Sequence, residues 1–402
     1  MKTILIKLLS VALTLYFTSI IVFFQHYINI TYFIDAFLII IFFTVVIVNK
    51  DLKYSINEII YLFGLFVVIG LASSFWAIDF HEASYKSLQL FLILINLFVI
   101  YNSFKKFRLE DTFIYGVLLA SFVNYLIMLG FLEVPFNIIL PGGGNRAIGT
   151  TGNPNVLSIV MMISILSSII YINKNKEKYS KIFYYYQFLN IALALYMIVL
   201  TVSKKGIIFG TLLMFLYFML IIKRIKGIIT IGLILFITFM YFYYFIEFDD
   251  IIFHYNNIMV RFDALNTSLS GGTGWDSTTI RKNLILSGID AIENRPLLGY
   301  GMANFHFVSF NGQYAHNNYI ETLANVGIIG AIVFYLIYIS LIKKIFMMKK
   351  CDLKYMLFYF VLIFLFMDFA VVTYGSKFTI YTLLYLAFIA ELHKKTIKNK
   401  IF

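Results

Sequence analysis

The sequence contains little of what a soluble or secreted protein needs. Its 402 residues include one cysteine, Cys351, and charged residues make up 13% of the chain, about half the usual share in a soluble domain. A single cysteine excludes an intramolecular disulfide and a thiolate metal cage. The sequence also has no phosphate-binding loop, no His/Cys metal spacing and no Gly-rich dinucleotide fingerprint. These absences exclude a soluble enzyme, a disulfide-rich scaffold and a disordered chain.

The chain is instead rich in apolar residues, which make up 61% of it. They form runs long enough to cross a membrane. Twelve such runs occur, at 3–25, 29–48, 58–75, 84–103, 111–133, 155–172, 182–201, 205–222, 226–246, 318–342, 353–372 and 376–392. A run of this length in lipid must satisfy its own backbone polar groups, so we predict helices. We therefore expect an all-α integral membrane protein with about twelve transmembrane helices, the first of them an uncleaved span.

The basic residues predict the orientation of these spans. With the N-terminus in the cytoplasm, the inner loops hold 23 of the 32 Lys and Arg residues. This asymmetry follows the positive-inside rule and places both termini in the cytoplasm. The net charge of +12 is then a signal of topology, and we do not expect nucleic acid as a partner.

One connection is much longer than the others, and it lies on the expected outer side between the ninth and tenth spans. We divide the chain accordingly into a nine-helix region (1–246), a large extracytoplasmic loop (247–317) and a three-helix region (318–402) that together form one catalytic unit. Long loops in compact proteins are usually functional. The loop is predicted to hold an amphipathic helix from Thr279 to Glu293. Acidic residues at its start could hold a divalent metal, but a solvated run is favoured and we predict no metal site.

Basic residues on the outer side work against the positive-inside rule, so each invites an explanation. Arg offers a planar fork for phosphate oxygens and Lys a point charge, which together would suit an anionic group such as a diphosphate. Anchoring to lipid headgroups is the alternative, and it is favoured for Lys377 and Arg261. The candidates for a diphosphate site are Arg146, Lys204, Lys205, Arg281 and Arg295.

His316 is the strongest single candidate for chemistry. It directly precedes the tenth span, which Asn317 is expected to cap and which carries Glu321 in its first turn. The helix dipole there favours a neutral imidazole, which suits a base or a hydrogen-bond acceptor. A polar anchor is the plainer interpretation. His306 is close enough in the loop to be kept as a second histidine, and Gly327 and Gly330 are expected to let another helix pack closely.

Four stretches resemble the bacterial O-antigen ligase and O-antigen/capsule polymerase (Wzy-type) superfamily. They are SFWAID (74–79), RAIGTTGNPN (146–155), SKKG (203–206), and the segment from Arg281 through NRPLLGYG (294–301) and NF (304–305) to HNNY (316–319) and GIIG (327–330). The last is the most specific, because order, spacing and the long loop agree. One departure is Lys204, where the family commonly has Arg.

The resemblance implies a membrane-embedded glycosyltransferase without a cofactor. Such an enzyme moves a glycan from an undecaprenyl-diphosphate carrier to an acceptor sugar hydroxyl on the extracytoplasmic face of the bacterial cytoplasmic (inner) membrane. By motif, Arg146, Lys204 and Arg281 would hold the diphosphate, and His316 would face the acceptor hydroxyl. A direct displacement would be metal-independent and inverting. Supporting roles are expected for Asn153, Asn155, Asn317, Asn318 and Glu321.

The shared motifs do not separate a polymerase from a ligase. A polymerase takes a lipid-linked repeat unit as acceptor, and a ligase takes lipid A core or another terminal acceptor. We favour the polymerase, because a Lys-rich, Arg-poor composition suggests the AT-rich coding regions often seen in polysaccharide gene clusters. Membrane lipid and a chain-length regulator protein are further expected partners. A lipid-linked oligosaccharide transporter would place charges deep in the spans and show two similar halves. Here Asp35 and Asp368 are the only intramembrane acids, the charge gathers at one face, and the sequence shows no internal repeat.

Overall fold

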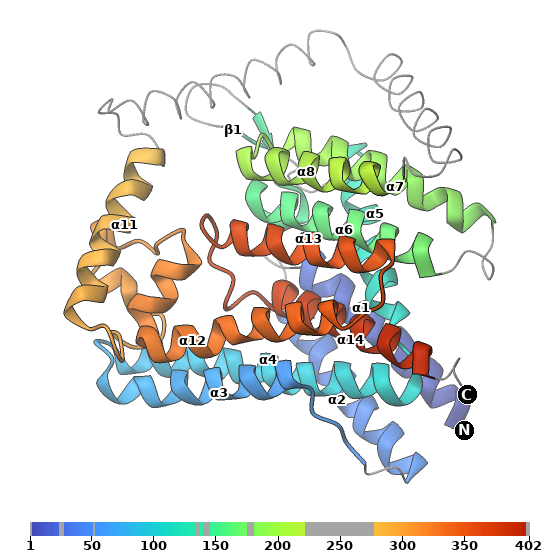
Figure 1. Ribbon diagram of the computed structural model, residues 1–402, viewed down its shortest axis with the longest axis horizontal. Helices are drawn as coiled ribbons and strands as arrows, with labels where there is room; N and C mark the ends of the chain where they lie inside the picture. Colours follow the sequence, from blue (N-terminus) through green and yellow to red (C-terminus); the bar gives the residue numbers. More distant parts are fainter. Residues whose placement is uncertain are drawn as a thin grey trace. The chain divides into compact units, whose positions relative to one another are not determined.

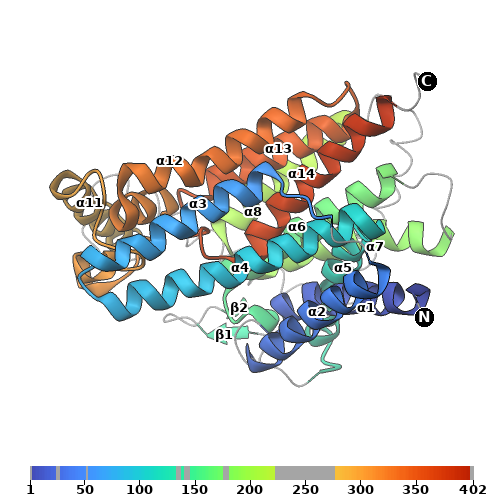
Figure 2. The ribbon, with the colours of Figure 1, turned by 90° about the horizontal axis from the view of Figure 1, so that it is seen from below.

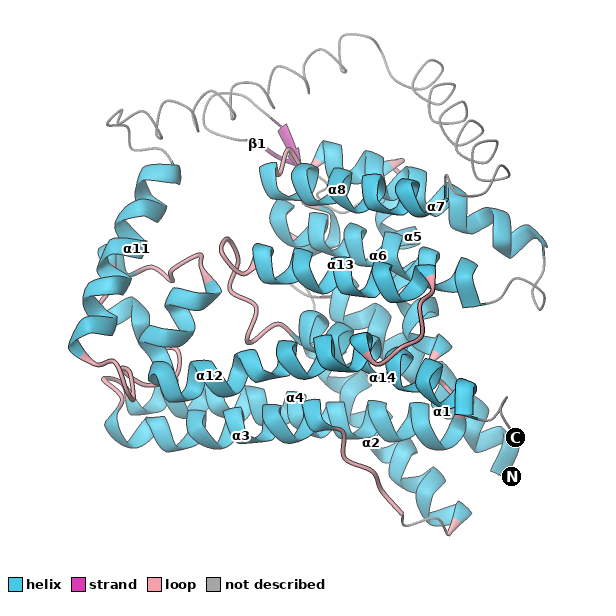
Figure 3. Ribbon diagram, in the orientation of Figure 1, coloured by secondary structure: helices cyan, strands magenta, loops and turns pink. Residues whose placement is uncertain are grey.

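The computed structural model describes residues 2–23, 28–50, 53–132, 137–139, 145–174, 181–221 and 277–398. Helices dominate this part of the chain, and its strands are two segments of three residues each (Figure 3). Eight of the described helices are long and apolar enough to cross a membrane. They confirm the expected all-α membrane class. The count of twelve spans is not confirmed, and the predicted span at 226–246 lies outside the described residues.

The chain divides by packing into two compact units. Unit 1 comprises Met1–Asn49 and Glu110–Ala264, and unit 2 comprises Lys50–Leu109 and Leu265–Phe402. This division by packing does not test the three sequence segments 1–246, 247–317 and 318–402, which stay a prediction.

Unit 1 is built around a nearly buried helix, α6. Its helices are α1 (Lys2–Val22), α2 (Ile28–Asn49), α5 (Asp111–Met128), α6 (Pro154–Lys174), α7 (Lys181–Leu200) and α8 (Lys204–Ile221). In Figure 1, α7 and α8 run alongside α6, and both contact it. A Cβ at Gly206 of α8 would lie 2.5 Å from the Cβ of Ser158 on α6. The glycine therefore allows the start of α8 to approach α6 closely.

A small hairpin precedes α6 in unit 1. Strands β1 (Asn137–Ile139) and β2 (Asn145–Ala147) are antiparallel, with Ile138 opposite Arg146. The 3-10 turn η2 (Gly149–Thr151) leads from β2 into α6. Pro141 and the glycine run of residues 142–144 lie outside the described residues.

Unit 2 has six described α-helices. They are α3 (Glu58–Ser73), α4 (Phe80–Phe107), α11 (Ser277–Asn294), α12 (Asn318–Phe346), α13 (Asp352–Met367) and α14 (Lys377–Lys398), with the 3-10 turns η1 (Ser74–Trp76), η3 (Phe305–Phe307) and η4 (Phe310–Gly312). Among them are the two longest described helices, α4 and α12, of 28 and 29 residues. Helices α3, α4 and α12 run side by side in both views (Figures 1 and 2). Helix α11 packs on α12 and confirms the predicted loop helix.

Helix α12 is broken at Gly327, where the backbone has φ 63° and ψ −173°. A segment that follows α11 fills the break. Tyr300 and Gly301 donate their N–H groups to the carbonyls of Ala324 and Asn325 at 2.8 Å, and Ile328 donates to Pro296 at 2.9 Å. These bonds satisfy groups that an unbroken helix would pair within itself.

The glycine at this break therefore has a different role from the predicted one. A Cβ at Gly327 would lie 2.1 Å from the carbonyl oxygen of Leu297. The residue admits the backbone of 296–299, and Gly330 is the glycine that faces another helix, because its Cβ position lies 3.4 Å from Ile69 of α3.

Candidate functional site

Two of the sequence motifs meet within unit 1. Asn155, in the first turn of α6, accepts a hydrogen bond from the hydroxyl of Ser203 at 2.9 Å. Asn153 begins the same helix by accepting from the N–H of Asn155 at 2.9 Å. Arg146 is 8% exposed, and its Nε donates to the carbonyl oxygen of Thr201 at 2.9 Å. The segment 146–155 and the turn 201–203 are thus joined by side chains that the sequence predicted to support a site.

The lysine pair of this motif opens α8. Lys204 and Lys205 are both half-buried and occupy its first two positions. Cations at the positive end of a helix dipole are electrostatically unfavourable. An anion bound there would relieve this repulsion, as the predicted phosphate contact would.

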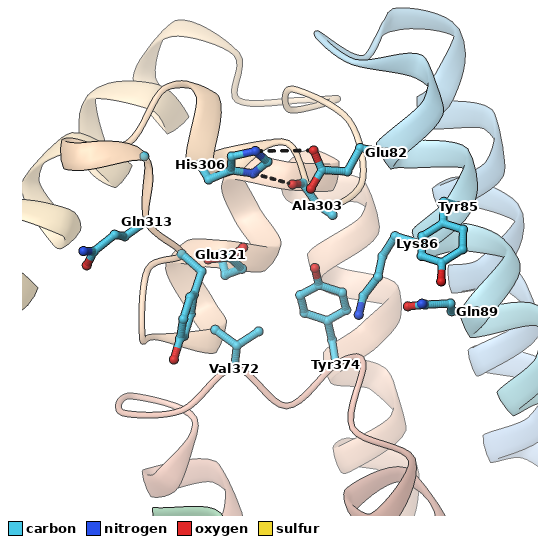
Figure 4. A pocket seen from close by; sticks show the side chains of 12 residues that line it. Glu82, Tyr85, Lys86, Gln89, Ala303, His306, Gln313, Glu321, Val372 and Tyr374 are labelled. Atoms are coloured by element: carbon cyan, nitrogen blue, oxygen red, sulfur yellow. Dashed lines mark hydrogen bonds and ion pairs between the residues drawn. The ribbon is translucent and has the colours of Figure 1, made fainter. Parts of the chain in front are cut away.

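Unit 2 has a polar cavity of about 590 Å³ at one end of its helices. Four segments bound it: the first turns of α4, the connection between α11 and α12, the first turn of α12, and the turn between α13 and α14 (Figure 4). It is lined by Glu82, Tyr85, Lys86, Gln89, Ala303, His306, Gly312, Gln313, Tyr314, Glu321, Val372 and Tyr374. All of these segments lie on the side of the membrane that the distribution of basic residues predicts to be extracytoplasmic.

A histidine and a carboxylate face each other in this cavity. The Nδ1 atom of His306 lies 3.0 Å from the carbonyl oxygen of Ala303, and its Nε2 lies 3.3 Å from Oε2 of Glu82 (Figure 4). Both side chains are partly exposed, at 30% and 42%. They therefore remain accessible to a molecule in the cavity.

A second carboxylate is nearly buried on the cavity wall. Glu321, which is 5% exposed, accepts from the backbone N–H of Ala315 at 2.6 Å and from the side chain of Asn325 at 3.4 Å. Asn325 also accepts from the N–H of Phe305 at 2.7 Å. Glu321 and Asn325 thereby hold the connection that carries His306 and His316 against the start of α12.

Arg281 and His316 both lie beside Tyr314, a residue of the cavity wall. The rings of Tyr314 and His316 are in contact, with centroids 4.0 Å apart. Burial lowers the pKa of Arg281, and the neighbouring Tyr314 acts in the opposite direction. Burial raises the pKa of Tyr314, which the charge of Arg281 opposes. A partly desolvated guanidinium interacts more strongly with an anion than one in bulk water.

The asparagine pair after His316 is structural. Asn317 caps α12, as predicted, by accepting from the N–H groups of Tyr319 and Ile320 at 3.0 and 3.2 Å. Asn318 is buried and donates from Nδ2 to Oδ2 of Asp368 at 3.1 Å. Together they hold the start of α12 in place, next to the turn that follows α13.

Arg295 is exposed and lies over the ring of Tyr300, 4.7 Å from its centroid. This cation–π contact attaches it to the segment that fills the break in α12. Within unit 2, Arg281 and His316 therefore both interact with Tyr314 of the cavity wall, whereas Arg295 contacts Tyr300.

The sequence analysis gave no role in the site to Glu82, Lys86, Tyr314 or Tyr374, and it kept His306 only as a second histidine. Lys86 lies over the Tyr374 ring, 5.9 Å from its centroid, although 288 positions separate the two along the chain. No local motif signals such a pair. Glu82 offered a faint signal, because it follows the helix-capping Asp79 directly after the 74–79 motif.

The described helices and this cavity define a multi-pass all-α membrane protein with a polar site at one end of its spans. A family model described as O-antigen ligase matches residues 189–335, from within α7 to within α12. The match bears out the resemblance to the O-antigen ligase and polymerase family, whose members are membrane enzymes acting on lipid-linked polysaccharide. A comparison with curated proteins gives no match.

Proposed function

We propose that the chain is a glycosyltransferase that moves a glycan from undecaprenyl diphosphate to a hydroxyl of an acceptor sugar. One observation carries the proposal beyond the family match. Arg281 and His316, which the sequence motifs assign to the leaving group and to the acceptor, both interact with Tyr314, a residue that lines the cavity. This transfer requires a cation and a base close to each other.

The transfer is a displacement at the anomeric carbon of the donor sugar. The acceptor oxygen forms the new bond as the bond to the diphosphate oxygen breaks, and the configuration at that carbon inverts. His316 accepts the proton of the acceptor hydroxyl. Cationic side chains neutralise the charge that develops on the diphosphate, so the reaction proceeds without a metal. Arg281, Arg146, Lys204, Lys205 and Arg295 are the proposed phosphate ligands, and their sharing of one diphosphate stays a prediction.

The acceptor separates the two forms of this activity. We favour a polymerase that joins lipid-linked repeat units of a surface polysaccharide, outside the cytoplasmic membrane. This preference rests on the composition, in which Lys is far commoner than Arg. A ligase that transfers the finished chain to lipid A core or another terminal acceptor is the alternative, supported by the description of the matching family.

The test is the size distribution of the cell's surface polysaccharide after deletion of this gene. Acceptors capped with a single repeat would identify a polymerase, and full-length chains held on undecaprenyl diphosphate would identify a ligase. The wild-type gene restores normal chains, and His316→Ala is expected not to restore them. Normal chains with His316→Ala would exclude His316 as the base, and normal chains in the deletion strain would refute the proposed function.

A further inference from the structure

Glu82 and His306 lie on two segments that are joined by hydrogen bonds of the Asn304 side chain. Glu82 lies in the first turn of α4, whose cap Asp79 accepts the N–H of Glu82 at 2.8 Å. Asn304, fully buried, accepts the N–H of Asp79 at 2.6 Å and donates to the carbonyl of Met302 at 3.0 Å. These bonds leave little freedom between the α4 start and the turn that carries His306. The pair is therefore preorganised before any ligand binds.

The contact with Ala303 fixes which nitrogen of His306 faces Glu82. A carbonyl oxygen can only accept, so Nδ1 of His306 carries a hydrogen that it donates to Ala303. Nε2 therefore faces the carboxyl group, 3.3 Å from Oε2 of Glu82. The two side chains present their polar atoms side by side to a molecule in the cavity.

The other groups in the cavity suit a sugar better than a diphosphate. Glu82 and Glu321 line the wall together with Lys86 and His306, so the lining offers a diphosphate no excess of cations. Sugar hydroxyls can donate to the exposed carboxyl oxygens of Glu82. Tyr85 lines the same cavity and is 64% exposed, so its ring offers a face for the apolar side of a sugar.

We propose that Glu82 and His306 position the acceptor sugar, with Glu82 accepting its hydroxyls and Tyr85 packing against its ring. The inference rests on the proposed glycan transfer and deepens it by assigning the cavity to the acceptor. Glu82 and His306 act by holding the acceptor next to the base, so they are positioning residues. The class of ligand is an uncharged sugar with neighbouring hydroxyl groups.

The first experiment uses the purified full chain in nanodiscs, with lipid-linked repeat units prepared from the host cell. The acceptor is the oligosaccharide released from the repeat units by mild acid, which has no diphosphate and so cannot act as donor. Donor and acceptor carry different isotope labels, and each is varied while the other is held constant. Glu82→Gln and His306→Gln are expected to raise the acceptor KM about tenfold, the effect of one lost charge-assisted hydrogen bond. The donor KM should not change. The matched control is Glu58→Gln, an exposed carboxylate at the start of α3.

A second measurement does not depend on turnover. The oligosaccharide released by mild acid from the same repeat units serves as the probe, and its saturation transfer from the intact protein is recorded by NMR. Wild type and Glu58→Gln should give a signal that Tyr85→Ala and Glu82→Gln lose. A raised donor KM with an unchanged acceptor KM would overturn the assignment, and so would an unchanged probe signal. Probe binding by a wild type that transfers no glycan would support the cavity assignment while refuting the proposed function.

Discussion

At the scale of single residues, Tyr314 connects the candidate catalytic groups of unit 2. Its ring contacts the His316 ring, and its phenol lies near Arg281. Burial raises its pKa, so the phenol stays protonated through the neutral range. The ring contact restricts the imidazole, which must point at a hydroxyl to act as a base. Tyr314 therefore deserves separate tests of its ring and its hydroxyl.

We predict that Tyr314→Phe keeps most of the activity, because the ring contact with His316 survives. Tyr314→Ala should lower the turnover about tenfold or more, since an unrestrained base is misplaced for much of the time. Initial rates of glycan transfer at saturating substrate test this. Equal rates for the two variants would show that the ring contact does not orient His316.

Arg281 should be needed for the leaving group. Arg281→Gln is expected to reduce turnover about 100-fold or more, the usual cost of losing one preorganised group that stabilises developing charge. Arg281→Lys should recover part of it, because a point charge replaces the planar fork. Lys282→Gln, a change at the adjacent exposed cation, is the control and should leave turnover within about twofold. A similar loss of turnover in Arg281→Gln and Lys282→Gln would mean that turnover depends on the total positive charge of α11 and not on Arg281 in particular.

At the scale of elements, the segment 296–301 fills the break in α12 and attaches the loop that lines the cavity to this helix. The break lets the 296–301 segment pair with open backbone groups of α12. In the same segment, the carbonyl oxygen of Leu298 accepts a hydrogen bond from the indole N–H of Trp76 at 3.1 Å. The α3–α4 turn, the loop and α12 are therefore held as one structure, on which Glu82 and His306 both depend.

Gly327→Ala should destabilise the protein by several kcal/mol, since it adds a steric clash to a strained backbone. The thermal unfolding midpoint of the protein in nanodiscs measures this. Gly130→Ala is the matched control, because Gly130 also has a positive φ, 77°, but among the described residues beyond its chain neighbours no atom lies within 4 Å of its Cβ position. We expect the control to cost about 1–2 kcal/mol. Similar losses in both variants would mean that the clash with Leu297 is relieved by movement of the loop.

At the end of unit 2 away from the cavity, the carboxylate of Glu391 joins several helices. Glu391 accepts hydrogen bonds from Lys344 at 2.7 Å, Asn57 at 2.9 Å and Tyr101 at 3.0 Å, and so joins α14 to α12, to the start of α3 and to α4. Glu391→Gln should lower the unfolding midpoint while leaving both KM values unchanged, because the cavity lies at the other end of α4. Glu293→Gln, at an exposed position of α11, should change neither. A changed acceptor KM for Glu391→Gln would indicate coupling along α4.

At the scale of the whole molecule, the topology remains a prediction that labelling can test. In a Cys351→Ser background, single cysteines are placed at Lys50 and at Lys282, both exposed positions. A membrane-impermeant thiol reagent should label position 282 in intact cells and position 50 only after permeabilisation. Labelling of position 50 in intact cells would reverse the orientation and place the cavity on the cytoplasmic side.

The sequence by itself determined the helical membrane class and the helices at the core of each unit. This worked because lipid leaves an apolar run few backbone options, and because caps such as Asn317 act over three residues. It also identified Arg281 and His316 as candidates. These signals are local in the chain, so they can be read without knowing the fold.

Only the tertiary structure decided which groups face one another. Glu82 and His306 are 224 positions apart, and their contact depends on hydrogen bonds through Asn304 that no spacing reveals. The break at Gly327 was likewise hidden, because a glycine in an apolar run equally suits close helix packing. Its left-handed conformation is imposed by the loop that packs against it, and that contact exists only once distant segments have folded together.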